Sequence, residues 1–255
     1  MIPETLRLAI DRLATESPLL IASDYDGVLS PIVPDPAAAV PDERALTALT
    51  RLAVLSNTHT VAISGRALAT LEALTGAPDG LVLVGTHGAE ERGAPVGQGL
   101  DARVDGLASD LLGLAKQHPG AEVEKKPLGA AFHYRHVDDS RKALAAESAV
   151  RIAARANART IAGKMVVECI FGDANKGAAV DRLRDRYGAV AVIFLGDDVT
   201  DEDAFAVLRD NDVGIKVGDG ETIASHRVAD QGHVAEVFEY LWERRSGDST
   251  PLGSG

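Results

Sequence analysis

The sequence predicts an α/β protein built on a doubly wound parallel sheet, with an α+β lobe inserted into it. The first observation is a set of continuous apolar runs, each followed by serine or glycine, which is typical of strands buried on both faces of a parallel sheet. These runs cover residues 19–22, 61–63, 81–84 and 191–195. The second observation is that helical patterns separate the runs, at residues 42–54, 66–75 and 176–187. Repeated alternation of strand and helix favours the doubly wound class.

The middle of the chain has a different pattern, which predicts the inserted lobe. Apolar and charged residues nearly alternate over residues 121–126, 130–136 and 165–170, as expected of strands with one face toward solvent or a ligand. Helical patterns over residues 100–117 and 140–157 separate these strands. We therefore expect three parts: a core of residues 1–90 and 168–245, an α+β cap of residues 91–167, and a disordered Gly/Ser-rich tail of residues 246–255.

Length, composition and charge narrow the classes of function. The chain has 255 residues, 45% of them apolar, so it can bury a full core, and its longest apolar run, residues 189–195, is too short to cross a bilayer. A net charge of −12 argues against a nucleic-acid-binding surface, which needs clustered cations. The single cysteine, Cys169, cannot form an intrachain disulfide, and no Cys/His cluster has zinc-ligand spacing, so any metal must bind to oxygen atoms. Because the N-terminal residues show no hydrophobic leader, we expect a cytoplasmic protein.

Polar side chains follow three of the predicted strands, at the edge of the sheet where open α/β folds bind their ligands. Asp24 and Asp26 are two residues apart in extended chain, so both carboxylates project to one side and repel each other unless a cation or a proton is present. Asp197, with Asp198 and Asp201 behind it, can complete an all-oxygen site suited to Mg²⁺. The sequence therefore predicts a magnesium site at this edge.

Two further residues add groups that a phosphoryl ligand needs. Ser64 follows the second predicted strand, and Lys176 opens the helix that leads into the last long strand. A hydroxyl, a lysine and a metal ion together neutralise and hold a phosphoryl group. Each residue alone has an ordinary structural explanation, because Ser64 could only cap a helix, Lys176 could be a solvated charge, and the aspartates could be turn formers or helix caps. Their coincidence at strand ends favours the functional interpretation.

In this order and spacing, Asp24-Tyr25-Asp26-Gly27-Val28, Ser64, Lys176 and Gly196-Asp197-Asp198 with Asp201 resemble the four motifs of the haloacid dehalogenase superfamily. The resemblance implies that Asp24 is a nucleophile and Asp26 an acid/base, while Ser64 and Lys176 hold the phosphoryl oxygens. It implies metal ligands from Asp24, the Asp26 carbonyl oxygen, Asp197 and Asp201. It also implies a Rossmann-like core and a substrate-selecting cap between the second and third motifs, which is where the predicted lobe lies.

Finer features resemble the trehalose-6-phosphate phosphatases within that superfamily. They are Gly85-Thr86-His87-Gly88-Ala89-Glu90, Glu124-Lys125-Lys126, His133-Tyr134-Arg135, Lys164 with Glu168, and the run from Gly196 to Phe205. The resemblance implies a Mg²⁺-dependent hydrolase in trehalose biosynthesis, which releases phosphate from trehalose 6-phosphate through an aspartyl-phosphate. It implies a phosphorylated disaccharide as the ligand, with no nucleic acid or membrane partner, and leaves the oligomeric state open, a monomer included.

The predicted cap strands carry charges of both signs. Glu124 and Lys126 lie on one face of a strand, Arg135 ends a neighbouring strand, and Lys164 and Glu168 flank a third. Carboxylates accept and basic groups donate hydrogen bonds, a combination suited to sugar hydroxyls, although outer-face salt bridges would give the same pattern. The predicted substrate contacts are His87, Gly88, Glu124, Lys126, Arg135, Lys164, Glu168, Arg66 and Asp198.

Three alternatives stay open at this point. The nearest is the same chemistry on another sugar phosphate, such as a sucrose or mannosylglycerate phosphate. The second is a non-catalytic regulatory domain resembling a phosphatase, against which the intact Asp24, Asp26, Lys176 and Asp197 argue. The third is a phosphorelay receiver, which also surrounds an aspartyl-phosphate with acids and a lysine but is much shorter and lacks an inserted lobe.

Overall fold

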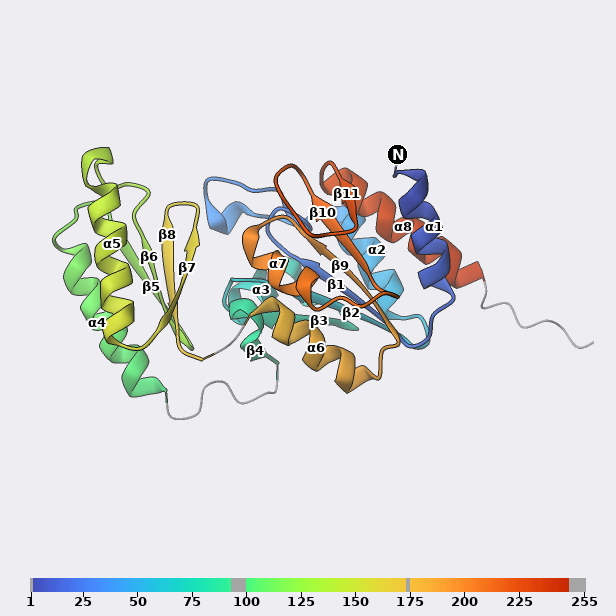
Figure 1. The fold of residues 1–255 in the computed structure, drawn as a ribbon, viewed down its shortest axis with the longest axis horizontal. Coiled ribbons are helices and arrows are strands. Elements are labelled where there is room, and N and C mark those ends of the chain that lie inside the picture. Colours follow the sequence, from blue (N-terminus) through green and yellow to red (C-terminus); the bar gives the residue numbers. More distant parts are fainter. Residues whose placement is uncertain (1, 93–99, 173–174, 248–255) are drawn as a thin grey trace, which may run out of the picture. The chain divides into compact units, whose positions relative to one another are not determined.

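The fold was obtained as a computed structural model, which describes residues 2–92, 100–172 and 175–247 (Figure 1). The chain forms two compact units. The core unit comprises Met1–Arg92 and Asn175–Gly255, and the inserted unit comprises Gly93–Ala174. The predicted α/β class is confirmed, with a mostly parallel sheet in the core unit and a separate antiparallel sheet in the inserted unit.

The core unit is built on a seven-stranded sheet in the order β11-β10-β9-β1-β2-β3-β4. All of its pairings are parallel except that of β3 with β4. The strands are β1 (Leu19–Asp24), β2 (Thr58–Ile63), β3 (Leu81–Gly85), β4 (Glu90–Glu91), β9 (Ala191–Gly196), β10 (Val213–Val217) and β11 (His226–Val228). Because β1 lies between β9 and β2, chain segments far apart in sequence end side by side at the middle of the sheet.

Helices cover both faces of this sheet, as the continuous apolar runs predict. Alternate β1 residues enter different clusters, since Leu19 and Ile21 pack with α1, α2 and α8 while Leu20 and Ala22 pack with α6 and α7. The helices are α1 (Glu4–Ala14), α2 (Glu43–Ala53), α3 (Leu68–Thr75), α6 (Lys176–Tyr187), α7 (Val199–Ala206) and α8 (Gln231–Gly247), with short 3₁₀ turns at Pro36–Ala38 and Thr86–Gly88. Both faces of the sheet are therefore buried, and the polar groups lie at the ends of its strands.

The inserted unit is a four-stranded antiparallel sheet in the order β5-β6-β8-β7, with two helices on one face. Its elements are α4 (Asp101–Ala115), β5 (Glu122–Lys126), β6 (Gly129–His133), α5 (Asp139–Arg155), β7 (Arg159–Gly163) and β8 (Val166–Ile170). Ala130, Phe132, Val167 and Cys169 pack against the helices. The side chains that alternate with them lie on the opposite face.

The structure differs from the sequence-based boundaries in three places. The predicted core boundary at residue 168 falls inside β8, which pairs with β6 and β7 and so belongs to the inserted unit. Strand β6 ends at His133, because residues 134–137 form a turn closed by the Val137 N–H on the Tyr134 carbonyl. Helix α8 continues to Gly247, and the rest of the predicted tail, residues 248–255, lies outside the described residues.

No helix in the described ranges is long and apolar enough to span a membrane.

Candidate active site

The candidate site lies at the carboxyl ends of three adjacent strands. Asp24 is the last residue of β1, Ser64 follows β2, and Asp197 follows β9. The parallel register places Asp24 opposite Ile63 and Ser23 opposite Leu195, so all three polar residues emerge at one edge of the sheet. The sheet topology therefore brings together residues that are more than 170 positions apart in the chain.

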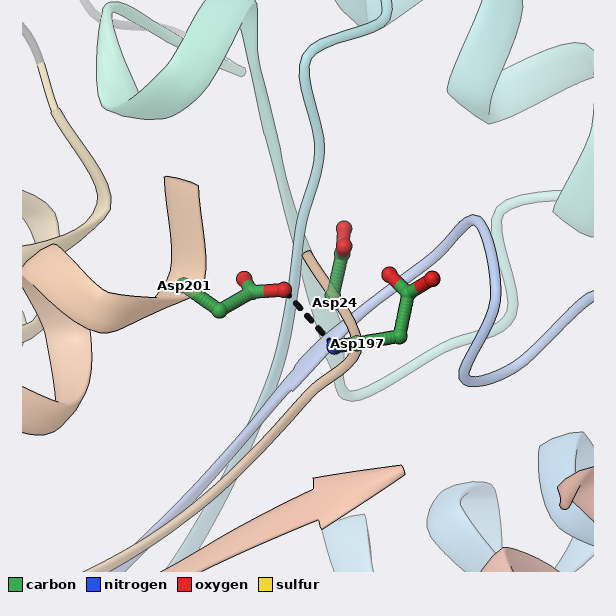
Figure 2. Close-up of side chains that lie close together, drawn as sticks. All are labelled: Asp24, Asp197 and Asp201. Carbon is green, nitrogen blue, oxygen red and sulfur yellow. Dashed lines mark hydrogen bonds between the residues drawn. The ribbon is translucent and has the colours of Figure 1, made fainter. Parts of the chain in front are cut away.

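Three carboxylates form the centre of the site. Asp24, Asp197 and Asp201 each offer an oxygen, and these oxygens all lie within 4.8 Å of one another. Figure 2 shows the three side chains, from the end of β1, the turn after β9 and the first turn of α7. Asp24 and Asp201 are buried, and Asp197 is partly buried. Three carboxylates this close repel one another unless a cation or a proton is present.

Lys176 supplies part of that charge. Asn175 caps α6 by accepting the Ala178 N–H at 2.8 Å, which fixes the first helical turn and the start of the lysine side chain. The Lys176 ammonium lies 2.8 Å from an Asp24 oxygen and 2.7 Å from an Asp201 oxygen, and the side chain is only 2% exposed. The interpretation of Lys176 as a solvated surface charge is therefore wrong.

The electrostatics of this group are dominated by burial and by its excess of carboxylates. Burial raises the pKa of Asp24 well above its ordinary value, and the carboxylates of Asp201 and Asp197 act in the same direction, while Lys176 opposes them. Burial alone would lower the pKa of Lys176, but the carboxylates of Asp201 and Asp24 outweigh it and raise that pKa, so the ammonium stays charged. Lys176 thus offsets part of the negative charge of Asp24 and Asp201.

Asp201 organises the turn that carries Asp197. One of its oxygens accepts the backbone N–H groups of Asp197 and Asp198, at 2.8 and 2.9 Å, and the other receives Lys176. Asp198 is the N-cap of α7 and forms a capping box with Asp201, so Asp198 has the helix-capping role that the sequence also allows. Both Asp201 oxygens are thus engaged by the protein, which makes Asp201 a support for the site.

Asp26 does not join the carboxylate group, although it is two residues from Asp24. Its carboxylate pairs with Arg66, whose Nε and Nη2 atoms lie 2.8 and 2.6 Å from the two oxygens. The Asp24 carboxylate instead accepts the Tyr25 N–H at 2.6 Å and pairs with Lys176. The expectation that both carboxylates project together is therefore not met, because the chain turns after Asp24 and separates them.

Ser64 is fully buried and lies in a loop joined to the segment after β3. Its hydroxyl oxygen accepts the Arg66 N–H at 3.1 Å, and its carbonyl accepts the His87 N–H at 2.9 Å. Thr86 and His87 both have positive φ, at 45° and 53°, a strained conformation for two successive residues with side chains. A Cβ atom on Gly65 would lie 2.7 Å from the His87 ring, so His87 packs directly on the Ser64 loop.

Gly88 joins the same segment to the start of α6. Its φ is +108°, and a Cβ atom there would lie 2.8 Å from the Ala179 Cβ and 2.9 Å from the Asn175 carbonyl oxygen. The predicted contact residues His87 and Gly88 are therefore placed between the loop of Ser64 and the helix of Lys176.

Sequence reasoning missed three groups that support Asp197. Lys216 is buried in β10 and donates to the Asp197 carbonyl oxygen. Gly27 has a φ of +81°, and a Cβ there would lie 2.1 Å from an Asp197 oxygen, so only glycine leaves room for that carboxylate. Gln231 donates to the Gly27 carbonyl at 2.6 Å. The signal for Lys216 is in the sequence, since it is a lone charge inside the apolar run Val213–Val217.

The predicted cap residues of the inserted unit lie partly together on one sheet face. Glu124 and Glu168 are both opposite Ala131, and Lys126 lies on the same face of β5. The Lys126 ammonium is 3.0 Å from a Glu168 oxygen and almost fully buried. His133, 3.3 Å from Glu124, holds the pKa of that carboxyl below its ordinary value. This face of the sheet is thus charged, with donors and acceptors side by side.

The other two predicted cap residues are less well grouped. Arg135 lies two positions beyond the end of β6 and is exposed, so it does not end that strand as expected. Lys164 is exposed in the turn between β7 and β8, whereas Glu168 lies at the middle of β8.

The donor set fits a divalent metal ion. Asp24 and Asp197 offer carboxylate oxygens, the hard ligands that Mg²⁺ prefers, with Asp201 in support, and no described Cys or His side chain belongs to the group. Burial, with the carboxylates of Asp201 and Asp197, raises the pKa of Asp24, and a divalent ion at this place would oppose that shift by stabilising the carboxylate.

The fold has an aspartate-bearing edge at the centre of a doubly wound sheet and an α+β insertion between the serine and lysine segments. These two features define the class of haloacid dehalogenase-like phosphatases. The chain belongs to the trehalose-phosphatase family, whose profile matches residues 22–237.

Individual relatives agree with this assignment. The trehalose-6-phosphate phosphatase of Escherichia coli is 34% identical over 241 residues, which cover 89% of this chain and 88% of that protein. The trehalose-phosphate phosphatase of Mycobacterium avium is 37% identical, covering 91% of this chain and 63% of its own length. A bifunctional trehalose-6-phosphate synthase/phosphatase of Thermoproteus tenax is 32% identical over 92% of this chain, which spans only 34% of that longer protein.

Solved structures show the same fold. A crystal structure described as a trehalose-6-phosphate phosphatase related protein superposes with a TM-score of 0.76 at 27% identity, covering 90% of this chain and all of the other. The C-terminal domain of the Candida albicans trehalose-6-phosphate phosphatase gives a TM-score of 0.77 over 95% of this chain and 98% of that one. At 24% identity, this second likeness supports the fold alone.

Proposed function

We propose that this protein hydrolyses trehalose 6-phosphate to trehalose and phosphate. The observation that supports this most is the buried group of Asp24, Lys176 and Asp201 at the centre of the sheet, in a chain of the trehalose-phosphatase family. Buried charges are costly to keep, so a fold that only needed stability would replace them with apolar residues. Their retention supports a chemical role.

In the proposed reaction, an Asp24 oxygen attacks phosphorus and the bond from phosphorus to the sugar oxygen breaks. Asp26, protonated at that stage, donates its proton to the departing sugar oxygen. Asp26 then takes a proton from the water that attacks the aspartyl-phosphate, which releases phosphate and restores Asp24. Two displacements at phosphorus therefore need one nucleophile and one group that alternates between acid and base.

The remaining polar groups hold the phosphoryl oxygens and the nucleophile. Lys176 orients Asp24 and offers positive charge to the phosphoryl group. The Ser64 oxygen already accepts the Arg66 N–H, which leaves the hydroxyl proton available for donation to a phosphoryl oxygen. Asp24 and Asp197, with Asp201 in support, would hold Mg²⁺, together with the Asp26 carbonyl oxygen. The ion would neutralise charge on the phosphoryl oxygens when bound.

We assign recognition of the sugar part of the substrate to the inserted unit. Glu124, Lys126 and Glu168 present acceptors and a donor on one sheet face, which suits sugar hydroxyls. Arg135 and Lys164 are further candidates for the same ligand. In the core unit, His87, Gly88 and Asp198 are the corresponding candidates.

The experiment that tests this function is phosphate release from a panel of sugar phosphates, with Mg²⁺ and with a chelator. We expect trehalose 6-phosphate to give the highest kcat/KM, and sucrose and mannosylglycerate phosphates to be poor substrates. Activity should vanish with the chelator and return with Mg²⁺. A preference for another sugar phosphate would overturn the substrate but not the chemistry, and no activity on any member would support a regulatory role instead.

A further inference from the structure

Arg66 is a strongly held cation of the core unit that pairs with the proposed acid/base, Asp26, and has no task in the proposed reaction. It follows the Ser64-Gly65 pair after β2, and its side chain is only 14% exposed. Its side chain makes several well-formed contacts within the core unit, and these contacts define what it can do.

The contacts of Arg66 are directed at the protein itself. Nε and Nη2 donate to the two oxygens of Asp26, and Nη1 donates to the Pro36 carbonyl at 2.8 Å. The guanidinium also lies 5.7 Å from the centre of the Tyr25 ring. Each of its three nitrogens therefore donates to an atom of this chain, and two of them fix both oxygens of one carboxylate.

A two-point contact does more than neutralise charge. Guanidinium and carboxylate are both planar, so parallel hydrogen bonds fix the plane and direction of the Asp26 carboxylate, which a single contact from a lysine could not do. The backbone of residue 66 adds a second connection, because its N–H donates to the Ser64 hydroxyl. The same residue thus sets the positions of the proposed acid/base and of a proposed phosphate-binding hydroxyl.

We infer that Arg66 is a positioning residue, which holds the Asp26 carboxylate in the orientation needed for proton transfer, and that it does not bind the substrate directly. This inference rests on the proposed function. The sequence-based expectation is that Arg66 contacts the ligand, but its three side-chain nitrogens donate to Asp26 and Pro36 instead. Proton transfer depends on placement within a fraction of an ångström, so losing the orientation should slow the chemical steps and leave substrate affinity nearly unchanged.

The test is a double-mutant cycle on the Mg²⁺-loaded full chain with trehalose 6-phosphate: wild type, Arg66→Gln, Asp26→Asn and the double variant. We expect Arg66→Gln to lower kcat by about 10- to 100-fold with KM changed by less than about threefold. Asp26→Asn should lower kcat by about 10²- to 10⁴-fold. In the Asp26→Asn background, Arg66→Gln should cost no more than about twofold, because both changes remove the same effect. Arg66→Lys, which keeps the charge, should recover only part of the loss.

A second readout uses an aryl phosphate with a good leaving group, whose departure needs no proton from Asp26. Arg66→Gln and Asp26→Asn should both release a rapid burst of aryl alcohol, because hydrolysis of the aspartyl-phosphate becomes the slow step. Losses that multiply in the double variant, or a raised KM with unchanged kcat, would overturn the inference and make Arg66 a substrate ligand. A wild-type protein with no phosphatase activity would instead overturn the proposed function, and this inference with it.

Discussion

The buried position of Lys176 leads to a quantitative prediction for Lys176→Met. Methionine is similar in length and apolar, so the change removes the charge without opening a large cavity. The Asp24 and Asp201 carboxylates would lose partners at 2.8 and 2.7 Å while remaining buried. Removing one partner of a buried ion pair costs about 3–5 kcal/mol. We expect the free energy of unfolding of the core unit to fall by that amount.

Urea denaturation in the presence of a chelator measures this loss without compensation by a metal ion. The protein has one tryptophan, Trp242 in α8, so its fluorescence reports on the core unit alone. With an m value of about 2–3 kcal/mol/M, the midpoint should fall by roughly 1–2.5 M. Adding Asp24→Asn to Lys176→Met should recover part of the loss, because it removes one of the two stranded charges.

The matched control is Arg44→Met, in the same unit. Arg44 pairs with Glu239 at 2.7 Å, but both side chains are exposed, so the midpoint should hardly move. A loss below about 1 kcal/mol for Lys176→Met would refute the reasoning, since it would mean that Asp24 and Asp201 are not both charged and buried beside the ammonium. A loss that Asp24→Asn deepens would refute it as well.

Three further predictions concern other parts of the molecule. Gly88→Ala should destabilise the core unit by about 1–3 kcal/mol and lower activity, because the new Cβ meets Ala179 and Asn175. Gly76→Ala, also at positive φ but with open space around the new Cβ, should cost less. Equal losses of stability in thermal denaturation would contradict the steric argument. Burial raises the pKa of Cys169 from 9.0 to about 12, so the folded state favours the neutral thiol. The stabilising contribution of this neutral thiol is complete below pH 9 and is lost as the pH rises toward 12. A thiol reagent at pH 8 should label no group in the native protein and one group in denaturant. Glu124→Ala should lower kcat/KM for trehalose 6-phosphate by roughly 10- to 150-fold but leave kcat/KM for a small aryl phosphate almost unchanged. Lys125→Ala, on the opposite face of the strand, is the control. Equal loss of kcat/KM on both substrates would point to a folding defect in the inserted unit.

The central part of the site could be predicted from the sequence for a physical reason. Strands buried on both faces have continuous apolar runs, and parallel strands end at one edge, so the polar residues after such runs must converge. Asp24, Ser64 and Asp197 follow this rule. Lys176 is predicted by a different signal, because the asparagine before it is a helix N-cap and so places the lysine in the first turn of a helix.

Other features depend on side-chain directions that spacing alone does not determine. The spacing of Asp24 and Asp26 predicts that their carboxylates lie together, but the Asp26 carboxylate pairs with Arg66, 40 positions away, because the chain leaves the extended conformation after β1. Strand β7 was not predicted, since Arg159–Gly163 is mostly exposed and has little apolar pattern. The pairing of Lys126 with Glu168 likewise requires the register of β5, β6 and β8, which no local pattern specifies.

The central claim is that Asp24 carries the phosphoryl group during turnover, and chemical trapping tests it most directly. The protein with Mg²⁺ would be mixed with trehalose 6-phosphate, quenched, and treated with borohydride, which reduces an acyl phosphate to an alcohol and so converts a phosphorylated aspartate to homoserine. Peptide mass spectrometry should then find homoserine at position 24, only when substrate is present and not in Asp24→Asn. Homoserine at another aspartate, or full turnover with none at position 24, would contradict the account.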